Sequence, residues 1–285
     1  MKTLILTVLA LLFSCMEMMG QDSVTYTKSD SIKIERILKE TAKMPDDAQP
    51  VLYFARKFLG VPYVSHTLEL PGKERLVVNT RQLDCLTFVE TVTSLSICHA
   101  QGKTSFKDYC NVLRNLRYRG GKTDGYASRI HYSSEWITDN KAMGYVDVID
   151  APHELFSAKG IVDVWFMGKN PDKYKKLTEN KSDIRKIREM EKRVSGQHFR
   201  YIPKNKIKNT QLMRKTIHDG DILEIVTSIP GLDIAHVGFA AWHKDGLHLI
   251  NASSIHHKVV EEPMTLYRYM QKHPKQKGIR VLRIR

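Results

Sequence analysis

The chain has 285 residues, of which 42% are hydrophobic and 27% charged, a composition typical of a folded globular protein that excludes wholesale disorder. Its net charge of +14 predicts an anionic partner, such as nucleic acid, an anionic surface or an acidic small molecule. No stretch beyond the first residues approaches the roughly 20 apolar residues of a membrane-spanning helix, so we expect no transmembrane segment.

Residues 1–20 have the pattern of a secretory signal peptide. Lys2 precedes an apolar run from Leu4 to Phe13 that is too short for a permanent span. Cleavage after Gly20 would release an exported, periplasmic protein. The alternative is a lipoprotein anchored through Cys15, although Phe13 fits that pattern poorly. Export argues against nucleic acid as the partner and directs the positive charge toward the cell envelope and its acidic fragments.

Helical patterns dominate the first half of the chain. Capping residues and apolar spacing predict helices from about Asp30 to Pro45, Pro50 to Leu59, Cys85 to Leu95 and Ser105 to Tyr118, with a short strand at Leu76 to Val78. Residues 117–136 mix aromatic, basic and glycine residues without periodicity, which predicts a binding loop or, alternatively, a surface excursion. We expect a strand from Val162 to Met167 and a charged, solvated helix over residues 171–193.

The last third changes to the two-residue period of strands. Strands are predicted at Gly220 to Val226, Ile234 to Trp242, Leu247 to Ser253, Val259 to Val260 and Gly278 to Ile284, with a helix from Pro263 to His273. The Asp-Gly pair before Leu247 indicates a hairpin. We therefore predict an α+β fold in which the helix that begins at Cys85 packs on an antiparallel sheet. Residues 21–285 would form a single domain with insertions around residues 111–200.

Cys85 is the candidate nucleophile. It opens a helix whose predicted N-cap is Asp84, and unpaired backbone N–H groups in a first turn favour a thiolate. Once Cys15 is set aside, three cysteines remain, so at least one thiol is unpaired in an oxidising compartment. The pairing of Cys98 with Cys110 stays open, as does the alternative that Cys85 is only a small core residue.

His236 and Asn251 are the candidate base and orienting residue. A cysteine nucleophile needs a base within hydrogen-bond reach, and the base needs a partner that fixes its tautomer. In an antiparallel hairpin with an even-length loop, His236 and Asn251 share a face and lie opposite or diagonal to each other. A structural role for this histidine, or an odd-length loop that sends Asn251 to the other face, is the alternative.

Several motifs resemble those of a known family. Asp-Cys at a helix start, Gly-Asp-Ile at a strand, and His-Val-Gly followed by a polar residue resemble the NlpC-type cell-wall cysteine peptidases. Residues 83–90, 128–132, 201–204 and 231–238 resemble the N-acetylmuramoyl-L-alanine amidase-like branch of that superfamily. The resemblance extends from about Val51 to the C-terminus. It implies a papain-like core, with a sheet or half-barrel, and hydrolysis of the amide between muramic acid and L-alanine in anhydro-muropeptides.

Further residues complete the predicted site, Tyr63 through the resemblance and the loop residues through their chemistry. Asn251 stands where many relatives carry histidine, and either residue can orient an imidazole. Tyr63 is the expected hydroxyl donor to an oxyanion. The predicted substrate-binding set is completed by two motif aspartates and three residues of the 117–136 loop: Asp84, Asp233, Arg129, His131 and Trp136. Arg129 would meet a peptide carboxylate and Trp136 a sugar ring. For each loop residue, a purely structural role is the alternative.

Two other functions remain open at this point. The first is a γ-D-glutamyl-diaminopimelate endopeptidase, and the second is a non-catalytic basic module that binds cell-wall fragments. A zinc amidase is disfavoured because no His-Glu-x-x-His pattern occurs, so we expect neither a metal nor a cofactor in catalysis. The oligomeric state is not determined by the sequence, and a monomer is favoured.

Overall fold

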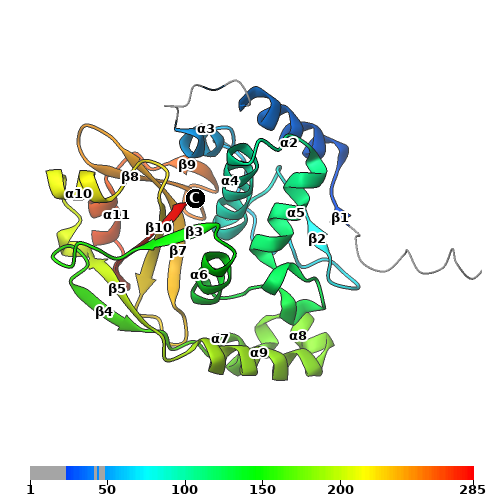
Figure 1. Ribbon diagram of the computed structural model, residues 1–285. Helices are drawn as coiled ribbons and strands as arrows, with labels where there is room; N and C mark the ends of the chain where they lie inside the picture. Colours follow the sequence, from blue (N-terminus) through cyan, green and yellow to red (C-terminus); the bar gives the residue numbers. More distant parts are fainter. Residues whose placement is uncertain (1–23, 42–43, 45–48) are drawn as a thin grey trace, which may run out of the picture.

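The computed structural model describes residues 24–41, 44 and 49–285 (Figure 1). The predicted signal peptide and Cys15 lie outside the described residues. The strands are β1 (Val24–Thr25), β2 (Leu76–Val77), β3 (Val146–Ile149), β4 (Ala158–Ile161), β5 (His198–Pro203), β6 (Ile222–Thr227), β7 (Ile234–Trp242), β8 (Leu247–Ser253), β9 (Lys258–Glu261) and β10 (Gln276–Ile284). The α-helices are α2 (Lys28–Thr41), α3 (Pro50–Arg56), α4 (Cys85–Ala100), α5 (Phe106–Arg117), α6 (Ser133–Ala142), α7 (Phe166–Lys169), α8 (Lys175–Glu179), α9 (Lys181–Val194), α10 (Gln211–Thr216) and α11 (Leu266–Gln271).

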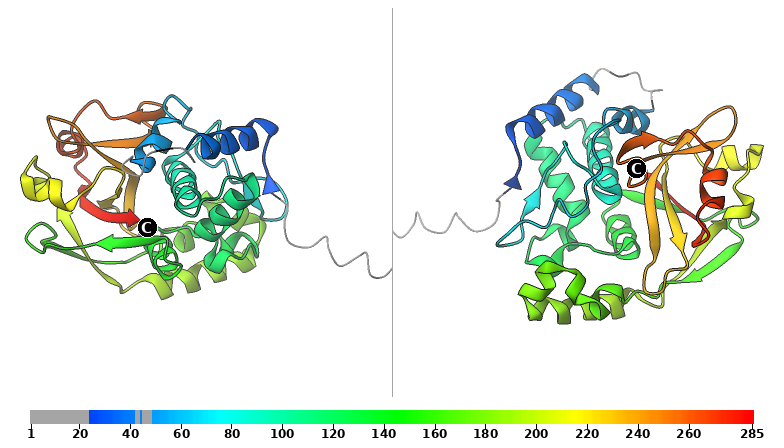
Figure 2. Two further views of the ribbon diagram at one scale, coloured as in Figure 1. Left: turned by 45° about the horizontal axis from the view of Figure 1, so that its top comes forward. Right: turned by 180° about the vertical axis from the view of Figure 1, so that it is seen from behind.

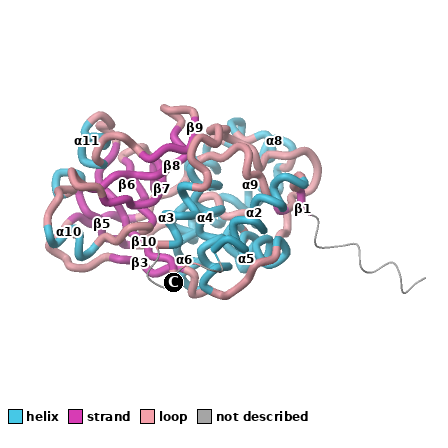
Figure 3. The backbone as a smooth tube through the Cα atoms, turned by 90° about the horizontal axis from the view of Figure 1, so that it is seen from above, coloured by secondary structure: helices cyan, strands magenta, loops and turns pink. Residues whose placement is uncertain are grey.

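One antiparallel sheet forms the C-terminal half of the fold. Its strands run in the order β4-β5-β10-β6-β7-β8-β9, and β3 pairs with β10. The hairpin of β7 and β8 pairs Trp242 with Leu247, which leaves the predicted even-length loop between them. Figure 3 shows the sheet on one side of the molecule and the helices α2 to α6 on the other. The predicted α+β class is therefore confirmed, whereas the papain-like assignment stays a prediction.

Helix α4 is the central element of the helical side. It packs on β7 and β8, where the Phe88 ring meets Phe239 edge to face with centroids 5.7 Å apart. The other side of α4 is covered by α2, α3 and α5 (Figures 1 and 2). The apolar residues Phe88, Val89, Val92 and Leu95 are buried, and so is every other residue from Thr87 to Cys98. A helix enclosed on all sides holds its first residue in a fixed place.

Two further hydrophobic clusters complete the core. One lies on the other face of the sheet, where alternate residues such as Leu223, Ile225 and Leu249 pack with α10 and α11. The second joins the loop before α6 to α7, α8 and α9, with Tyr132, Met167 and Ile187 among its members. This second cluster builds an outlying helical layer beside the start of β7 (Figure 1).

Several local predictions were wrong. Residues 162–167 are not a strand, since β4 ends at Ile161 and helix α7 begins at Phe166. The charged segment 171–193 is divided into a 3-10 turn, α8 and α9. The loop 117–136 contains two 3-10 turns and the start of α6.

Among the described residues, no helix is long and apolar enough to span a bilayer.

Candidate active site

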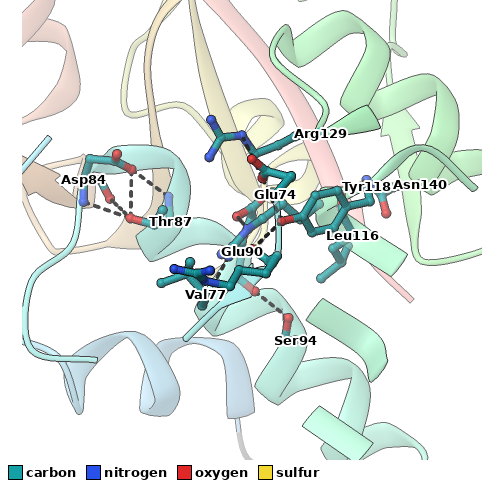
Figure 4. A network of polar contacts seen from close by, with 12 residues as sticks. Glu74, Val77, Asp84, Thr87, Glu90, Ser94, Leu116, Tyr118, Arg129 and Asn140 are labelled. Atoms are coloured by element: carbon teal, nitrogen blue, oxygen red, sulfur yellow. Dashed lines mark hydrogen bonds and ion pairs between the residues drawn. The ribbon is translucent and has the colours of Figure 1, made fainter. Parts of the chain in front are cut away.

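Cys85 is the first residue of α4, as predicted, and Asp84 is its N-cap. The Asp84 carboxylate accepts a hydrogen bond from the Thr87 backbone N–H at 2.8 Å, and the Thr87 hydroxyl accepts one from the Asp84 N–H at 2.9 Å (Figure 4). This reciprocal capping box fixes the direction in which the chain enters the helix. It also leaves the Cys85 N–H, which has no intrahelical acceptor in the first turn, available to an oxyanion.

The environment of Cys85 does not favour a resting thiolate, contrary to the prediction from helix position alone. Burial, followed by the negative charge of Asp84, raises the pKa of the Cys85 thiol to about 12. Backbone N–H groups of Val237, Leu86 and Cys85 itself act in the opposite direction but do not compensate. The thiol is therefore protonated at neutral pH and needs a base to become a nucleophile.

His236 lies on β7 directly before Val237, whose backbone N–H forms a hydrogen bond with the Cys85 sulfur. Its Nε2 is 2.8 Å from Asn251 Oδ1, which can only accept, so Nε2 carries the proton and Nδ1 keeps its lone pair. Burial lowers the pKa of His236, which keeps the imidazole neutral at physiological pH. The pairing of β6 with β7 is irregular next to His236, and such bulges commonly redirect a side chain.

Asn251 is completely buried on β8 and is held by a residue that the sequence analysis missed. Its Nδ2 donates to Glu262 Oε1 at 3.3 Å, which fixes the amide so that the oxygen faces His236. The second Glu262 oxygen is 3.1 Å from His256 Nε2. Gly238 leaves room for Asn251 on the neighbouring strand, because a Cβ at position 238 would lie 3.0 Å from the Asn251 Cβ. The predicted arrangement of His236 and Asn251 on one face is confirmed, and Glu262 extends it.

A cavity of about 270 Å³ opens beside these residues. Five of the predicted site residues line it: Cys85, His131, Trp136, Asp233 and His236. Residues that the sequence analysis did not select also line it, among them His66, Glu69, Met167 and Tyr174. His66 has a positive φ of 61°, an unusual conformation for a non-glycine residue that often marks a functional loop. No local sequence pattern identified these four, because the fold brings them together from separate segments.

Two of the lining residues combine exposure to the cavity with a structural contact. Asp233 Oδ2 accepts from the Ser134 N–H at 2.6 Å, so its carboxylate caps the start of α6. His131 Nε2 donates to the Tyr126 carbonyl at 3.0 Å, and burial lowers the pKa of His131 to about 3. His131 is thus a neutral surface of the cavity.

Trp136, a third lining residue, is 3% exposed, and its indole N–H has no hydrogen-bond partner among the described residues.

Arg129 is not placed as the sequence analysis predicted. Its side chain is 5% exposed and forms ion pairs with Glu69 and with Glu74, the latter at 3.7 Å. Figure 4 shows Arg129 beside Glu74. The Arg129 guanidinium also lies 4.9 Å from the ring centre of Tyr126. Because its charge is already neutralised and it lies outside the cavity lining, the structure gives it a role in holding the loop.

Tyr63 and Asp84 lie next to Cys85 but are not part of the cavity lining. The Tyr63 backbone pairs with Leu83 in an isolated parallel bridge, which brings the ring close to the start of α4. Burial, together with the neighbouring Cys85 and Asp84, raises the pKa of the Tyr63 phenol to about 12. The phenol therefore keeps its proton and can donate a hydrogen bond.

Comparison with known proteins is consistent with this site. The family model described as AmiA-like, N-acetylmuramoyl-L-alanine amidase-like, matches residues 53–279. The chain belongs to the N-acetylmuramoyl-L-alanine amidase-like family. The matched range contains helix α4, the His236 and Asn251 hairpin and Glu262, so the whole candidate site lies within the matched residues.

Solved structures extend the comparison. An N-acetylmuramoyl-L-alanine amidase from Bacteroides uniformis is 34% identical, with a TM-score of 0.77 over 86% of this chain and 99% of that one. A Bacteroides fragilis protein described as a candidate xylanase is 34% identical, with a TM-score of 0.76 over 81% and 99%. A Legionella pneumophila protein at 22% identity and a TM-score of 0.66, over 90% and 95%, shares the fold alone. A search of curated proteins found no match.

Family membership and the amidase neighbours support a cell-wall amidase, a hydrolase of peptidoglycan amide bonds.

Proposed function

We propose that this amidase-like protein is a cysteine-dependent N-acetylmuramoyl-L-alanine amidase that acts on soluble peptidoglycan fragments, anhydro-muropeptides in particular. The observation that carries the proposal is a single cavity lined by a helix-initiating thiol, Cys85, and by a neutral imidazole, His236, whose tautomer is fixed by Asn251. The proposed localisation is periplasmic after removal of residues 1–20, with a lipid anchor on Cys15 as the alternative.

In the proposed reaction the Cys85 proton moves to His236 Nδ1 as the sulfur attacks the lactyl carbonyl carbon of the muramic acid. The negative charge that develops on the carbonyl oxygen is stabilised by the Cys85 N–H, with Tyr63 as a second donor. The imidazolium returns its proton to the nitrogen of L-alanine as the C–N bond breaks. Water, deprotonated by His236, attacks the thioester, releases the sugar carboxylic acid and restores the thiol.

Trp136 and His131 would form the walls against which the substrate lies. An aromatic face is suited to a sugar ring, and the unpartnered Trp136 N–H is a donor that a substrate oxygen can satisfy. The cavity lining includes the carboxylates of Glu69 and Asp233 but no lysine or arginine. This lining does not support direct recognition of a peptide carboxylate by a cation in the cavity.

The product distribution tests the proposal. An anhydro-muropeptide with a tetrapeptide stem is incubated with the wild type, Cys85→Ala and the matched control Cys110→Ala, and the products are identified by mass spectrometry. We expect free stem peptide and intact disaccharide from the wild type and from Cys110→Ala only. Cleavage within the stem would identify an endopeptidase instead. Binding without turnover, unchanged in Cys85→Ala, would identify a non-catalytic binding module.

A further inference from the structure

A second group of chemically active side chains lies on the turn between β7 and β8. His243, Asp245 and His248 each offer one potential metal ligand, and these three atoms lie within 4.8 Å of one another. Among the described residues, these three form the one group of at least three histidine, cysteine, aspartate or glutamate side chains whose potential ligand atoms lie this close together. It does not belong to the catalytic cavity, whose lining contains none of the three.

The hydrogen bonds of His248 show which of its nitrogens is available. Nδ1 lies 2.8 Å from the Glu262 backbone carbonyl, which can only accept, so Nδ1 carries a proton. Nε2 of the same ring lies 2.9 Å from Asp245 Oδ1. If the imidazole were neutral, Nε2 would carry a lone pair that faces the negative Asp245 oxygen, and the two would repel each other. The contact is favourable only if a proton or a metal cation lies between Nε2 and Asp245 Oδ1. An imidazole that donates Nδ1–H to a carbonyl is the common form of a metal-ligating histidine.

The neighbouring residues are consistent with a cation. The rings of His243 and His248 are stacked with centroids 4.2 Å apart, so the second imidazole is already beside the first. His243 Nε2 lies 2.7 Å from Glu261 Oε1, a partner that can orient the His243 ring. The Asp245 side chain is 62% exposed and that of His243 41%, so both can move by the small amount needed for ligand atoms about 3.4 Å apart around a tetrahedral ion.

We propose that His243, Asp245 and His248 bind one divalent zinc ion at the β7–β8 hairpin, with water as the fourth ligand, because Arg56 and His243 already occupy the Glu261 carboxylate. Two imidazole nitrogens and one carboxylate oxygen match the preference of Zn²⁺, whereas Mg²⁺ and Ca²⁺ prefer oxygen donors alone. The ion would fasten the β7–β8 turn to the segment of Glu261 and Glu262. It has no role in the proposed amide hydrolysis.

Zinc titration of untagged protein tests this site. Because Cys85 and His236 could themselves bind zinc, every variant carries Cys85→Ala. We expect this parent and the control His153→Gln, an exposed histidine elsewhere, to bind one equivalent of Zn²⁺ in competition with a chromophoric chelator. Asp245→Asn and His243→Gln should each weaken binding by roughly tenfold or more. Cobalt(II) should bind in the same place and give a visible absorption band, whose titration midpoint both substitutions should shift to higher cobalt concentration.

Two results would overturn the site: absence of zinc binding by the parent, or equal binding by Asp245→Asn and His243→Gln. Either would mean that a proton, in an imidazolium–carboxylate pair, accounts for the contact of His248 with Asp245. Circular dichroism of each variant shows that it is folded, and the two substituted side chains are exposed, so misfolding is not expected. Neither result bears on the amidase proposal.

Discussion

At Cys85, two physical effects on the thiol have opposite signs. The helix N-terminus favours the thiolate, whereas burial and the Asp84 carboxylate favour the thiol, and the second pair prevails. At His236 burial favours the neutral imidazole. The resting Cys85 thiol and the His236 imidazole, which line one cavity, are therefore both neutral, and in the proposed reaction the proton moves only when the substrate is attacked. This differs from cysteine enzymes that hold a preformed thiolate–imidazolium pair.

The pH dependence of kcat/KM follows from these directions. Because burial lowers the pKa of His236 below its usual 6.5, protonation of the base should reduce kcat/KM only below about pH 6.5. Since burial raises the pKa of the Cys85 thiol to about 12, the thiol does not titrate below pH 9, and the profile should stay flat from about pH 7 to about pH 9. A profile measured on a defined anhydro-muropeptide checks this. An acid limb above pH 7 would contradict the neutral pair.

Glu262 is expected to act as a positioning residue. Its carboxylate orients Asn251, and its negative charge raises the pKa of His236. Glu262→Gln keeps the shape but removes the charge, so kcat should fall roughly threefold to tenfold, about 1 kcal/mol, with KM little changed. The acid limb should also move to lower pH, a shift that a purely structural role would not produce. Glu179→Gln, on an exposed helix end, is the matched control. An unmoved acid limb would refute the electrostatic role.

At the scale of elements, the N-terminus of α4 connects stability with reactivity. Asp84→Ala removes the cap and should lower the free energy of unfolding by about 1 kcal/mol. The same change removes a negative charge and should lower the pKa of the Cys85 thiol. Asp84→Asn separates the effects, because its amide oxygen still accepts from Thr87 while the charge is gone.

Urea unfolding and the pH dependence of Cys85 alkylation measure the two quantities. Asp84→Asn should be nearly as stable as the wild type, yet its thiol should react at lower pH. Equal stability losses in Asp84→Ala and Asp84→Asn, or an unchanged alkylation pKa in both, would show that the cap and the charge do not act as described.

Elements with a strong local pattern were predicted from sequence, and those without one were not. Helix α4 has a cap and a long apolar run, and the β7–β8 hairpin has strands of alternating residues around Asp-Gly. Strands β3 and β4, in contrast, are four residues long and are partly exposed, so their formation depends on partners far away in sequence. The same reason explains the wrong strand at residues 162–167, where packing in the α7–α9 layer prevails over local propensity.

The candidate site divides in the same way. His236 and Asn251 follow from strand register, which is local to one hairpin. Glu262 and the partners of Arg129 do not, since Glu69 lies 60 residues before Arg129 and no short-range pattern joins them. Charge alone suggested that Arg129 meets the substrate. Two carboxylates, those of Glu69 and Glu74, whose positions depend on the complete fold, neutralise it instead.

At the scale of the whole molecule, the net charge of +14 and the cavity have different roles. The cavity lining has carboxylates and histidines but no lysine or arginine, so the positive charge acts from the outer surface. Such a charge steers an anionic substrate over long range and is screened by salt. We expect kcat/KM toward an anionic muropeptide to fall severalfold between about 0.02 M and 0.3 M salt, with kcat constant. A salt-independent kcat/KM would exclude electrostatic steering.

The fold brings the Cys85 thiol and the His236 imidazole to a single cavity, where we propose that they carry out amide hydrolysis. The rate of stem-peptide release under single-turnover conditions tests it most directly, measured for the wild type, Cys85→Ala and His236→Ala. We predict that each substitution lowers this rate by about 10³-fold or more while the far-ultraviolet spectrum and substrate binding persist. A folded Cys85→Ala variant that releases stem peptide within about tenfold of the wild-type rate would contradict the account.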